Sequence, residues 1–582
     1  MPIKTIFTTK IELKKNKNLK NYLLAGDWCL KEEKFIKKNN VLSNIWESYT
    51  TISKHYRFLQ KVHKKINKEV SNYLFTYHNK VITKKIWNNL LFVWLTYYLF
   101  FYYFKWKTVE KIFKIHKKLI FISYSNTKSI RYIDSLDFYD KSSNSDILNY
   151  LAFKKVILFK KANKLINVKI VNKNQYLNST EISSNNKQLK GKSLLEYILL
   201  FIQKTFLNPR ILVIDGVNFK FNFFFNLFAM QFPTTYKNIF DWKTEKKKLN
   251  IRAKIKSTEF RTKGTKFEKF IYENIIHDIP LCFTSGFNQL NKIVNKIKFN
   301  PKIIISGTQH VHNEIAKLWV LKQKYIFNKK LFIVSHGGGH QNLSLTMYDY
   351  EHKIGNYFFQ WIDKKKFFNS RLPNTKYSFK NLKRKSNADK IIFVGNELKP
   401  YINRISPGPM SIYSSNTIND LEKIFKNLSI KIKPKIYYAP KKKLISYFKN
   451  KLLTIINKSK ILSISALDEN IKNCRLVICS YPQTTFFDSL LSGPTILVYN
   501  PKQWRHYKEL NRAYKTLKYN KIIFDNPVDA AKHINRVWHK IDLWWNEKEV
   551  IKARNLFLKE FNLPPKNNLL DIFRCLKIFK KV

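Results

Sequence analysis

Glycine and cysteine are scarce in this chain of 582 residues, which contains 13 glycines and five cysteines. The cysteines are scattered and include no Cys-x-x-Cys pair; they are Cys29, Cys282, Cys474, Cys479 and Cys575. This pattern excludes a disulfide framework and favours a reducing cytoplasm. The first residues also lack the apolar segment and cleavage site of a signal peptide, so we expect a cytoplasmic protein.

Several well-known motifs are missing as well. The chain contains no GxGxxG, GxxxxGK(S/T) or HExxH sequence, so it offers no standard dinucleotide, P-loop or zinc-protease motif. The HGGG stretch at 336–339 is similar to the oxyanion loop of esterases. Such a loop serves a GxSxG nucleophile elbow, and the chain has none.

Acidic residues are few, at 39 against 108 lysines and arginines, which gives a formal net charge of +69. Such a charge is typical of nucleic-acid binders. However, lysine is spread along the whole chain and accompanies abundant Ile, Asn, Phe and Tyr, which fits a genome rich in A/T codons. We therefore expect non-specific attraction to anionic lipids and nucleic acid, and no specific nucleic-acid site.

Long hydrophobic runs are also limited. The most apolar stretch, residues 90–104, would span about 22 Å as a helix, short of the ~30 Å hydrocarbon core of a membrane. We interpret it first as a buried helix, second as a membrane-surface helix and third as a transmembrane span. It belongs to the second of two predicted helices, 46–77 and 83–107, which form a helical insertion at about 46–120.

Outside this insertion, short apolar runs alternate with helical patterns, as in an α/β fold with parallel sheets. Predicted strands include 156–159, 168–171, 211–216, 302–306 and 331–334. Residues 275–283 are expected to end in another strand. A polar stretch at 380–390 predicts the boundary between an N-terminal domain, 1–385, and a C-terminal domain, 386–582, each of them Rossmann-like.

The clearest unit lies at 475–500, RLVICSYPQTTFFDSLLSGPTILVYN, and is predicted as strand, turn, short helix and strand. A helix N-terminus at the carboxyl edge of a parallel sheet can bind phosphate. The alternative is an ordinary βαβ unit that binds nothing. Three hydroxyl residues and one acid favour a nucleotide diphosphate and its ribose as ligands; they are Ser480, Thr484, Thr485 and Asp488.

A second candidate site follows the predicted strand at 331–334. His336 stands at the strand end, where it could act as a base or bind phosphate, and Gly337, Gly338 and Gly339 follow it. The alternative is a tight glycine turn with a solvent-facing histidine, but three glycines together favour function in a chain so poor in glycine. Glu351 and His352 lie in a polar stretch that could fold back on the same pocket.

Weaker candidates occupy other turns. Gly26 and Asp27 end the predicted strand at 22–29, and Gly395 ends the strand at 391–394. His310, His312 and Glu314 could in principle bind a metal, but on a turn that enters a helix we expect them to be solvated polar residues.

Three segments also occur together in the order and spacing of a known family. They are FTTKIEL with YLLAGDWC, FIVSHGGGH with YEHKI and FQW, and SYPQTTFFDSLLSGPTILVYN with WW and ARNLF. Together they resemble a bacterial family of transferases associated with O-antigen and other surface-carbohydrate loci, over most of the chain. That family is similar to GT-B glycosyltransferases, including capsule and glycerol-phosphate polymer transferases. The resemblance implies two Rossmann-like domains facing each other across a cleft, with the donor nucleotide mainly on the C-terminal domain.

The resemblance also assigns residues to that cleft. On the N-terminal side they are His336, Gly337, Glu351 and His352, and on the donor side Gln483, Thr484 and Thr485. The chain departs from the family at Asp488, where Glu is usual, and at Ser335, where Gln is usual.

The functional hypothesis is a metal-independent inverting glycosyltransferase of surface polysaccharide synthesis, with no cofactor. It would use a nucleotide-activated sugar and a glycan or lipid-linked glycan acceptor, with His336 or Glu351 as the base. One alternative is a transferase of glycerol- or ribitol-phosphate from a CDP-linked donor. Another, of a different class, is a basic non-catalytic protein that binds nucleic acid or an anionic membrane surface.

Overall fold

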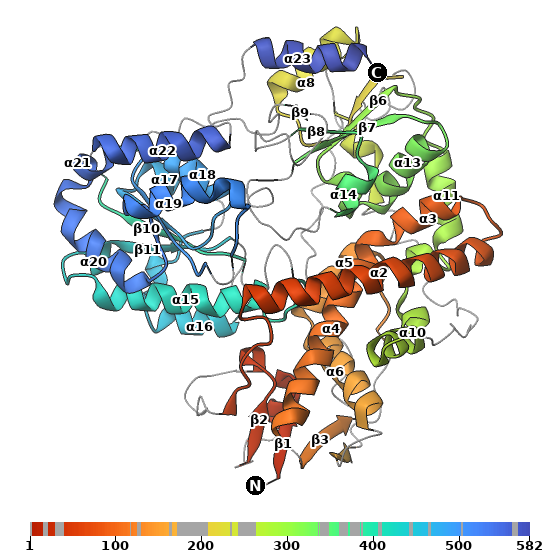
Figure 1. Cartoon of the computed structure of the whole chain (residues 1–582), viewed down its shortest axis with the longest axis horizontal. Helices are drawn as coiled ribbons and strands as arrows, with labels where there is room; N and C mark the ends of the chain where they lie inside the picture. Colours follow the sequence, from red (N-terminus) through yellow and green to blue (C-terminus); the bar gives the residue numbers. More distant parts are fainter. Residues whose placement is uncertain are drawn as a thin grey trace.

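A computed structural model describes the protein over residues 3–15, 21–29, 40–116, 118–124, 130–161, 166–171, 208–232, 235–242, 264–335, 337, 349–359, 371–372, 384–385, 388–397, 399–405, 410–441, 446–463, 467–501, 504–561 and 569–581. Within these ranges the longer strands form three parallel sheets accompanied by helices (Figure 1). The predicted α/β class with parallel sheets is therefore confirmed.

The first sheet has the strand order β2-β1-β3-β4, and each neighbouring pair is parallel. Ile6 and Phe121 are paired in its centre and fully buried, because both faces of a parallel sheet are covered. The strands are β1 (Lys4–Phe7), β2 (Tyr22–Leu24), β3 (Leu119–Tyr124) and β4 (Ile166–Val171). The accompanying helices are α1 (Lys10–Lys15), α5 (Ser135–Asn144) and α6 (Asp146–Lys161), with a 3-10 turn at Asp27–Cys29.

Three helices lie between β2 and β3 in the chain: α2 (Tyr49–Tyr77), α3 (Lys84–Leu90) and α4 (Phe92–Ile115). The Ser48 and Thr83 side chains begin α2 and α3 by accepting backbone N–H bonds. The predicted helix at 83–107 is thus divided at Leu91. α4 is buried over most of its length, so the first interpretation of its apolar stretch is confirmed. Of the helices in the described ranges, none combines the length and apolar character that a membrane crossing requires.

The second sheet has the strand order β5-β6-β7-β8-β9 and is also parallel. Its strands are β5 (Ile211–Val213), β6 (Ile303–Ser306), β7 (Lys330–Val334), β8 (Tyr357–Phe359) and β9 (Arg371–Leu372). Its helices are α8 (Phe219–Phe228), α10 (Lys266–Asp278), α11 (Phe287–Asn295), α12 (Gln309–His312), α13 (Glu314–Tyr325) and α14 (Asp349–Ile354). The predicted strand at the end of 275–283 is wrong, because those residues finish α10 and form a 3-10 turn at Leu281–Phe283.

The third sheet has the order β11-β10-β12-β13-β14 and a switch point between its first and third strands in the chain, as in Rossmann-like folds. Its strands are β10 (Ile391–Val394), β11 (Ile436–Ala439), β12 (Leu476–Cys479), β13 (Thr495–Val498) and β14 (Ile523–Phe524). Its helices are α15 (Met410–Asn427), α16 (Ser446–Leu453), α17 (Leu467–Lys472), α18 (Thr484–Ser492), α19 (Asn511–Tyr519), α20 (Pro527–Val537), α21 (Ile541–Trp545) and α22 (Lys548–Glu560).

The last helix, α23 (Leu569–Lys580), leaves the third sheet and packs on the second. The Phe579 ring lies 5.0 Å from that of Phe225 in α8 and 5.1 Å from that of Phe332 in β7. Figure 1 shows α23 beside α8, while α22 stays with the third sheet. The end of the chain therefore joins the two halves of the molecule.

A second connection follows β10. Lys399 donates to Ser143 Oγ of α5 at 3.1 Å, and Asn403 donates to the Tyr139 carbonyl at 2.9 Å. The segment 399–405 thus anchors the third sheet on the helices of the first.

Two sequence predictions about the N-terminal half require correction. The predicted strand at 156–159 lies inside α6, because a short apolar run cannot be distinguished from a buried helix by periodicity alone. Residues 1–385 also carry two separate parallel sheets, where the sequence predicted one Rossmann-like domain. β1, which comes before β2 and the helices α2–α4, pairs with β3, which comes after them, and this pairing joins the two parts of the first sheet.

Candidate functional site

Gly337, after β7 of the second sheet, lies close to Thr484 at the start of α18, which accompanies the third sheet. Gly337 lies three residues after β7 and is buried, and Thr484 is the first residue of α18. A Cβ atom built on Gly337 would lie 2.9 Å from Oγ1 of Thr484. The two candidate sites predicted from distant parts of the sequence therefore touch.

The N-terminus of α18 is placed to receive an anion. Gln483 precedes the helix in an extended conformation, and its side chain makes no capping hydrogen bond. Thr484 and Thr485 form the first turn and are half-buried. Since the first backbone N–H groups of a helix point out of its end, this turn presents a partial positive charge to the interface.

Asp488 lies one turn further along α18 and is half-buried. Burial raises the pKa of this carboxyl from 3.8 to about 7. At neutral pH the group can therefore donate a hydrogen bond when protonated or accept one when ionised.

Ser480 and Gly395 support the third sheet. The Ser480 hydroxyl is buried and donates to the Val394 carbonyl at 2.9 Å, which ties the end of β12 to the end of β10. The Gly395 N–H donates to the Ala439 carbonyl at 3.0 Å. A Cβ atom at Gly395 would lie 2.0 Å from the Tyr438 hydroxyl oxygen, so a side chain is excluded there. Both residues hold the sheet edge that carries α18.

Glu351 lies in α14 and is 7% exposed. Its Oε1 lies 3.2 Å from Nε2 of His310, and Nδ1 of His310 lies 2.9 Å from the Ser306 hydroxyl at the end of β6. The Tyr350 hydroxyl donates to the His310 carbonyl at 3.2 Å. This buried chain of groups fixes α14 against the carboxyl edge of the second sheet.

Asp215 anchors the other end of the same chain of groups. Its carboxylate accepts hydrogen bonds from the Gly307 N–H at 2.8 Å and the Thr308 N–H at 2.9 Å, and from the Ser306 hydroxyl at 3.1 Å. Burial by itself would raise the pKa of Asp215, but these hydrogen bonds and nearby His310 outweigh it, and the pKa is lowered. The carboxylate therefore stays ionised and holds the β6–α12 turn.

The expectation that His310 and Glu314 are solvated is wrong. His310 is fully buried in the network above, and Glu314 is fully buried in an ion pair with Lys317 at 2.9 Å. The polar turn predicted to face solvent packs against α14 and α5, which the sequence pattern of that turn does not reveal. His312 is exposed, as predicted.

Other predicted residues lie apart or outside the described ranges. His336, Gly338 and Gly339 lie outside the described residues. His352 is exposed on α14, with its ring 5.5 Å from that of Phe358. Gly26 and Asp27 follow β2 of the first sheet, which lies at the bottom of the view, below α14 and α18 (Figure 1). A Cβ atom at Gly26 would lie 2.3 Å from the Trp28 ring, which gives this glycine a packing role.

Sequence reasoning missed Asp215, Ser306 and His310 as parts of the site. A signal existed, because Asp215 and Ser306 each end an apolar strand, and parallel strands bring such residues to one edge. In the described residues, no three His, Cys, Asp or Glu side chains form a group that could hold a metal ion. The expectation of a metal-independent reaction stays a prediction.

Comparison with known proteins gives weak structural and strong family matches. Superposition finds MurG from Acinetobacter baumannii, with 11% identity over 51% of this chain and 78% of that one, at a TM-score of 0.29. It also finds MnaA from S. aureus in complex with UDP, with 12% identity over 64% of this chain and 96% of that one, at a TM-score of 0.31. A third match is the wall teichoic acid polymerase TagF, with 10% identity over 49% of this chain and 74% of that one, at a TM-score of 0.29.

A comparison with curated proteins by sequence finds no match. The sequence profile of one transferase family, in contrast, matches residues 4–573, which is nearly the whole chain. The protein belongs to the LIC12162 family of transferases.

Proposed function

We propose that this transferase is a GT-B-like glycosyltransferase of surface-polysaccharide synthesis that uses a nucleotide-activated sugar. The single observation that supports the proposal most is the contact between the Gly337 loop and the N-terminus of α18. It brings the edges of two parallel α/β sheets together, and such edges are where α/β proteins bind ligands. The donor diphosphate would lie on the first turn of α18, near Thr484 and Thr485.

The proposed reaction is a direct displacement. The acceptor hydroxyl oxygen forms a bond to the anomeric carbon while the bond from that carbon to the diphosphate breaks. The hydroxyl proton passes to a base, and the nucleoside diphosphate leaves with the bonding electron pair. The helix N-terminus stabilises the charge that develops on the leaving group, which supports a reaction without a metal ion.

We assign the base to His336 and a positioning role to Glu351. His336 directly precedes Gly337 in the sequence, and Gly337 is the residue that meets α18. Glu351 is 7% exposed and its Oε1 is engaged by His310. A carboxylate held in this way orients α14 more readily than it accepts a proton from a substrate.

The acceptor in this proposal is a glycan or lipid-linked glycan. The protein would act in the cytoplasm, with peripheral contact to an anionic membrane surface through its many lysines. A CDP-linked glycerol- or ribitol-phosphate donor would use the same interface, and the identity of the bound nucleotide separates the two reactions.

Nucleotide binding tests the proposal first. We would measure the thermal stability of the full-length protein with CMP, CDP, UDP, GDP, ADP and dTDP at fixed salt, with and without EDTA. A ligand at about 100 times its Kd should add ~2.7 kcal/mol of stability. One base should stand out and EDTA should leave the shift intact. Equal shifts with every polyanion, fading as salt is added, would contradict the proposal and favour the basic non-catalytic binder.

A matched pair of variants localises the bound nucleotide. Thr485→Ala removes a hydroxyl from the first turn of α18. Thr516→Ala removes one from α19, where the hydroxyl donates to the Arg512 carbonyl of the same helix at 2.8 Å. The nucleotide shift should fall in Thr485→Ala and persist in Thr516→Ala. Equal thermal shifts in both variants would show that the nucleotide does not bind at α18.

A further inference from the structure

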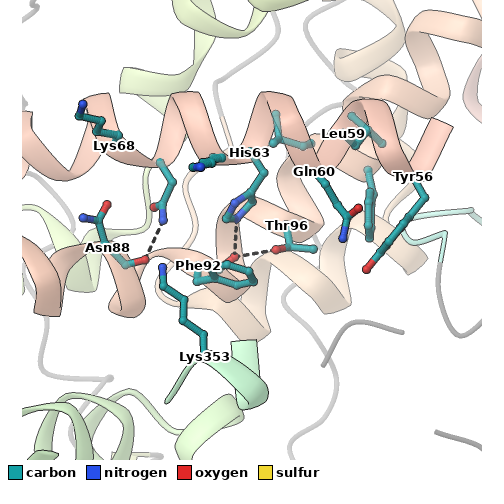
Figure 2. A pocket seen from close by; sticks show the side chains of 13 residues that line it. Tyr56, Leu59, Gln60, His63, Lys68, Asn88, Phe92, Thr96 and Lys353 are labelled. Atoms are coloured by element: carbon teal, nitrogen blue, oxygen red, sulfur yellow. Dashed lines mark hydrogen bonds between the residues drawn. The ribbon is translucent and has the colours of Figure 1, made fainter. Parts of the chain in front are cut away.

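A cavity of about 500 Å³ lies between α2, the start of α4 and α14 (Figure 2). Its wall is largely apolar and comes mainly from two helices; the apolar residues are Tyr56, Leu59, Phe92, Leu99 and Phe100. This volume and lining are typical of small-ligand sites. The cavity is therefore large enough for a hydrocarbon segment, which its wall would remove from water.

Three lysines stand at this cavity. Lys64 and Lys68 come from α2, one turn apart, and Lys353 comes from α14. Figure 2 shows Lys353 reaching from α14 toward Phe92, and its Nζ lies 5.4 Å from the centre of that ring. Among the described residues no carboxylate lies within 4 Å of any of the three. Partial burial lowers the pKa of Lys353, in keeping with an ammonium group held next to apolar surface.

The charge continues along the exposed side of α2. Lys54, Arg57, Lys61, Lys64 and Lys68 follow one another at spacings of three and four residues, and all five are exposed. They therefore form one stripe of the helix. The single acid of α2 is Glu69, which is directed to Tyr272 of α10 instead. A positive stripe about 20 Å long, without acids of its own, thus leads along α2 to the cavity.

The stripe also connects the two halves of the molecule. Its first residues, Lys54, Arg57 and Lys61, line a second, more open cavity of about 600 Å³ together with Arg505, which lies between β13 and β14 of the third sheet in the chain. At the other end, Lys353 lies two residues after Glu351 on α14, and the Tyr350 ring lies 5.7 Å from that of Phe92. The cavity is therefore adjacent to the helix that the hydrogen-bond network holds beside the proposed transfer site.

We propose that the cavity between α2, α4 and α14 binds a hydrocarbon chain that carries a phosphate or diphosphate group. The apolar wall takes the chain, and Lys64, Lys68 and Lys353 take the phosphate oxygens. Lysine is a flexible point charge that suits a phosphate, and an apolar cavity beside three lysines favours a molecule with both chemistries. That this molecule is the lipid-linked acceptor rests on the proposed function, whereas its binding to the cavity does not.

Direct binding tests the site without any transfer reaction. Radiolabelled farnesyl phosphate, below its aggregation concentration, would be equilibrated by dialysis against the full-length protein, with farnesol and inorganic phosphate in parallel. We expect farnesyl phosphate to bind saturably at one site and at least about tenfold more tightly than either half-ligand. Equal affinity for farnesol, or no saturable binding of farnesyl phosphate, would overturn the proposal.

Three variants separate the parts of the site. Lys353→Gln removes one cation, and Thr96→Phe fills the cavity from α4 with only the loss of a 2.7 Å bond to its own helix. Each should weaken farnesyl phosphate binding about tenfold. Lys532→Gln makes the same charge change at an exposed position of α20 and should leave binding unchanged. Unchanged binding in both cavity variants would show that farnesyl phosphate binds outside this cavity.

Two further measurements distinguish a prenyl phosphate from a membrane surface as the ligand, and separate this site from the proposed function. Vesicles containing an anionic phospholipid should not displace farnesyl phosphate; displacement would mean that the lysines bind a membrane surface, and the proposal would fail. The nucleotide thermal shift is measured on the same preparations. Loss of prenyl-phosphate binding with an intact nucleotide shift overturns this site alone, whereas absent nucleotide binding overturns the proposed function alone.

Discussion

The Glu351 carboxylate lies 3.2 Å from the buried imidazole of His310, and this contact joins α14 to the carboxyl edge of the second sheet. Through Ser306 the same imidazole reaches Asp215 at the end of β5. Three turns of one sheet edge are therefore tied by side chains in the protein interior. A loop that must meet α18 across the interface depends on such an edge being rigid.

Glu351→Gln should preserve this contact, because the amide oxygen can still accept from His310. We expect a thermal midpoint close to that of the parent and transfer within about tenfold of it. Glu351→Ala leaves His310 without that partner and should cost about 1–3 kcal/mol of stability.

The pH profile separates this positioning role from catalysis. The limb of the rate profile that reports the base should persist in Glu351→Gln and vanish in His336→Ala, which should lose at least about 100-fold in rate with normal nucleotide binding. If Glu351→Gln lost the limb and His336→Ala kept it, the two roles would be reversed.

Gly337→Ala tests the contact with Thr484. The added methyl group would lie 2.9 Å from Thr484 Oγ1, closer than a carbon and an oxygen normally approach. The two loops should separate slightly, and kcat/KM should fall about tenfold while the protein stays folded. Kinetics at saturating nucleotide measure this, and Thr484→Ser, whose hydroxyl turns more freely, should restore part of the loss. An unaffected kcat/KM in Gly337→Ala would show that the contact does not govern transfer.

The sequence predicted the parts of this interface better than their surroundings. The 475–500 unit and the strand before the glycine loop were located from apolar runs and turn residues, and the structure contains both. The roles of Ser480 and Gly395 were harder to predict, because neither a hydrogen bond to the Val394 carbonyl nor close packing against Tyr438 is visible in the spacing of the sequence. His310 was misjudged for the same reason.

The first sheet shows a different limit. Its strands β1 and β3 are separated in the chain by the three helices α2, α3 and α4, yet they pair directly. Nothing in the spacing of apolar residues reports a pairing over that distance, so two sheets were predicted as one domain. The cavity beside α14 was missed likewise, since α2 and α14 come from distant parts of the chain.

Arg384 stabilises the C-terminal end of α18, and its substitution tests this role. Its guanidinium donates to the Ser489 carbonyl at the end of α18 at 3.2 Å and to the Thr495 hydroxyl at 3.1 Å, and it also contacts the Pro494 carbonyl. Arg384→Lys loses the fork that reaches these acceptors together, and should lower stability by about 1–3 kcal/mol. Urea midpoints followed by tryptophan fluorescence would measure the loss.

Gly493→Ala should act on the same contact. Gly493 has a φ of +152°, and a Cβ atom there would lie 2.9 Å from Cδ of Arg384. The strain and the collision both favour glycine, so we expect a loss of at least about 1 kcal/mol. Lys472→Arg on nearby α17 serves as a neutral control. Normal stability in both Arg384→Lys and Gly493→Ala would show that this contact does not support α18.

The raised pKa of Asp488 predicts that the stability of the fold depends on pH with a defined sign. Its pKa is raised by burial to about 7 in the folded protein, against 3.8 ordinarily. Between these values the folded state binds a proton that the unfolded state has lost, so stability falls as pH rises from about 4 to about 7. Asp488→Asn removes this penalty. The variant should match the parent at the acid end and exceed it above pH 7, by at most about 4 kcal/mol.

The comparison of parent and variant is essential, because burial also raises the pKa of Glu12 to about 8 and that of Asp420 to about 6, with the same sign. Urea midpoints at pH 5.5 and pH 8 would isolate the contribution of Asp488 as the change in the difference between the two proteins. If the difference stayed constant between these pH values, the carboxyl would already be ionised at pH 5.5. Nucleotide binding gives a second measurement, because a ribose hydroxyl would donate to the ionised Asp488 carboxylate. If the pKa is raised, nucleotide should bind more tightly above pH 7 than below it. If the carboxyl is already ionised at pH 5.5, nucleotide affinity should not change with pH over this range.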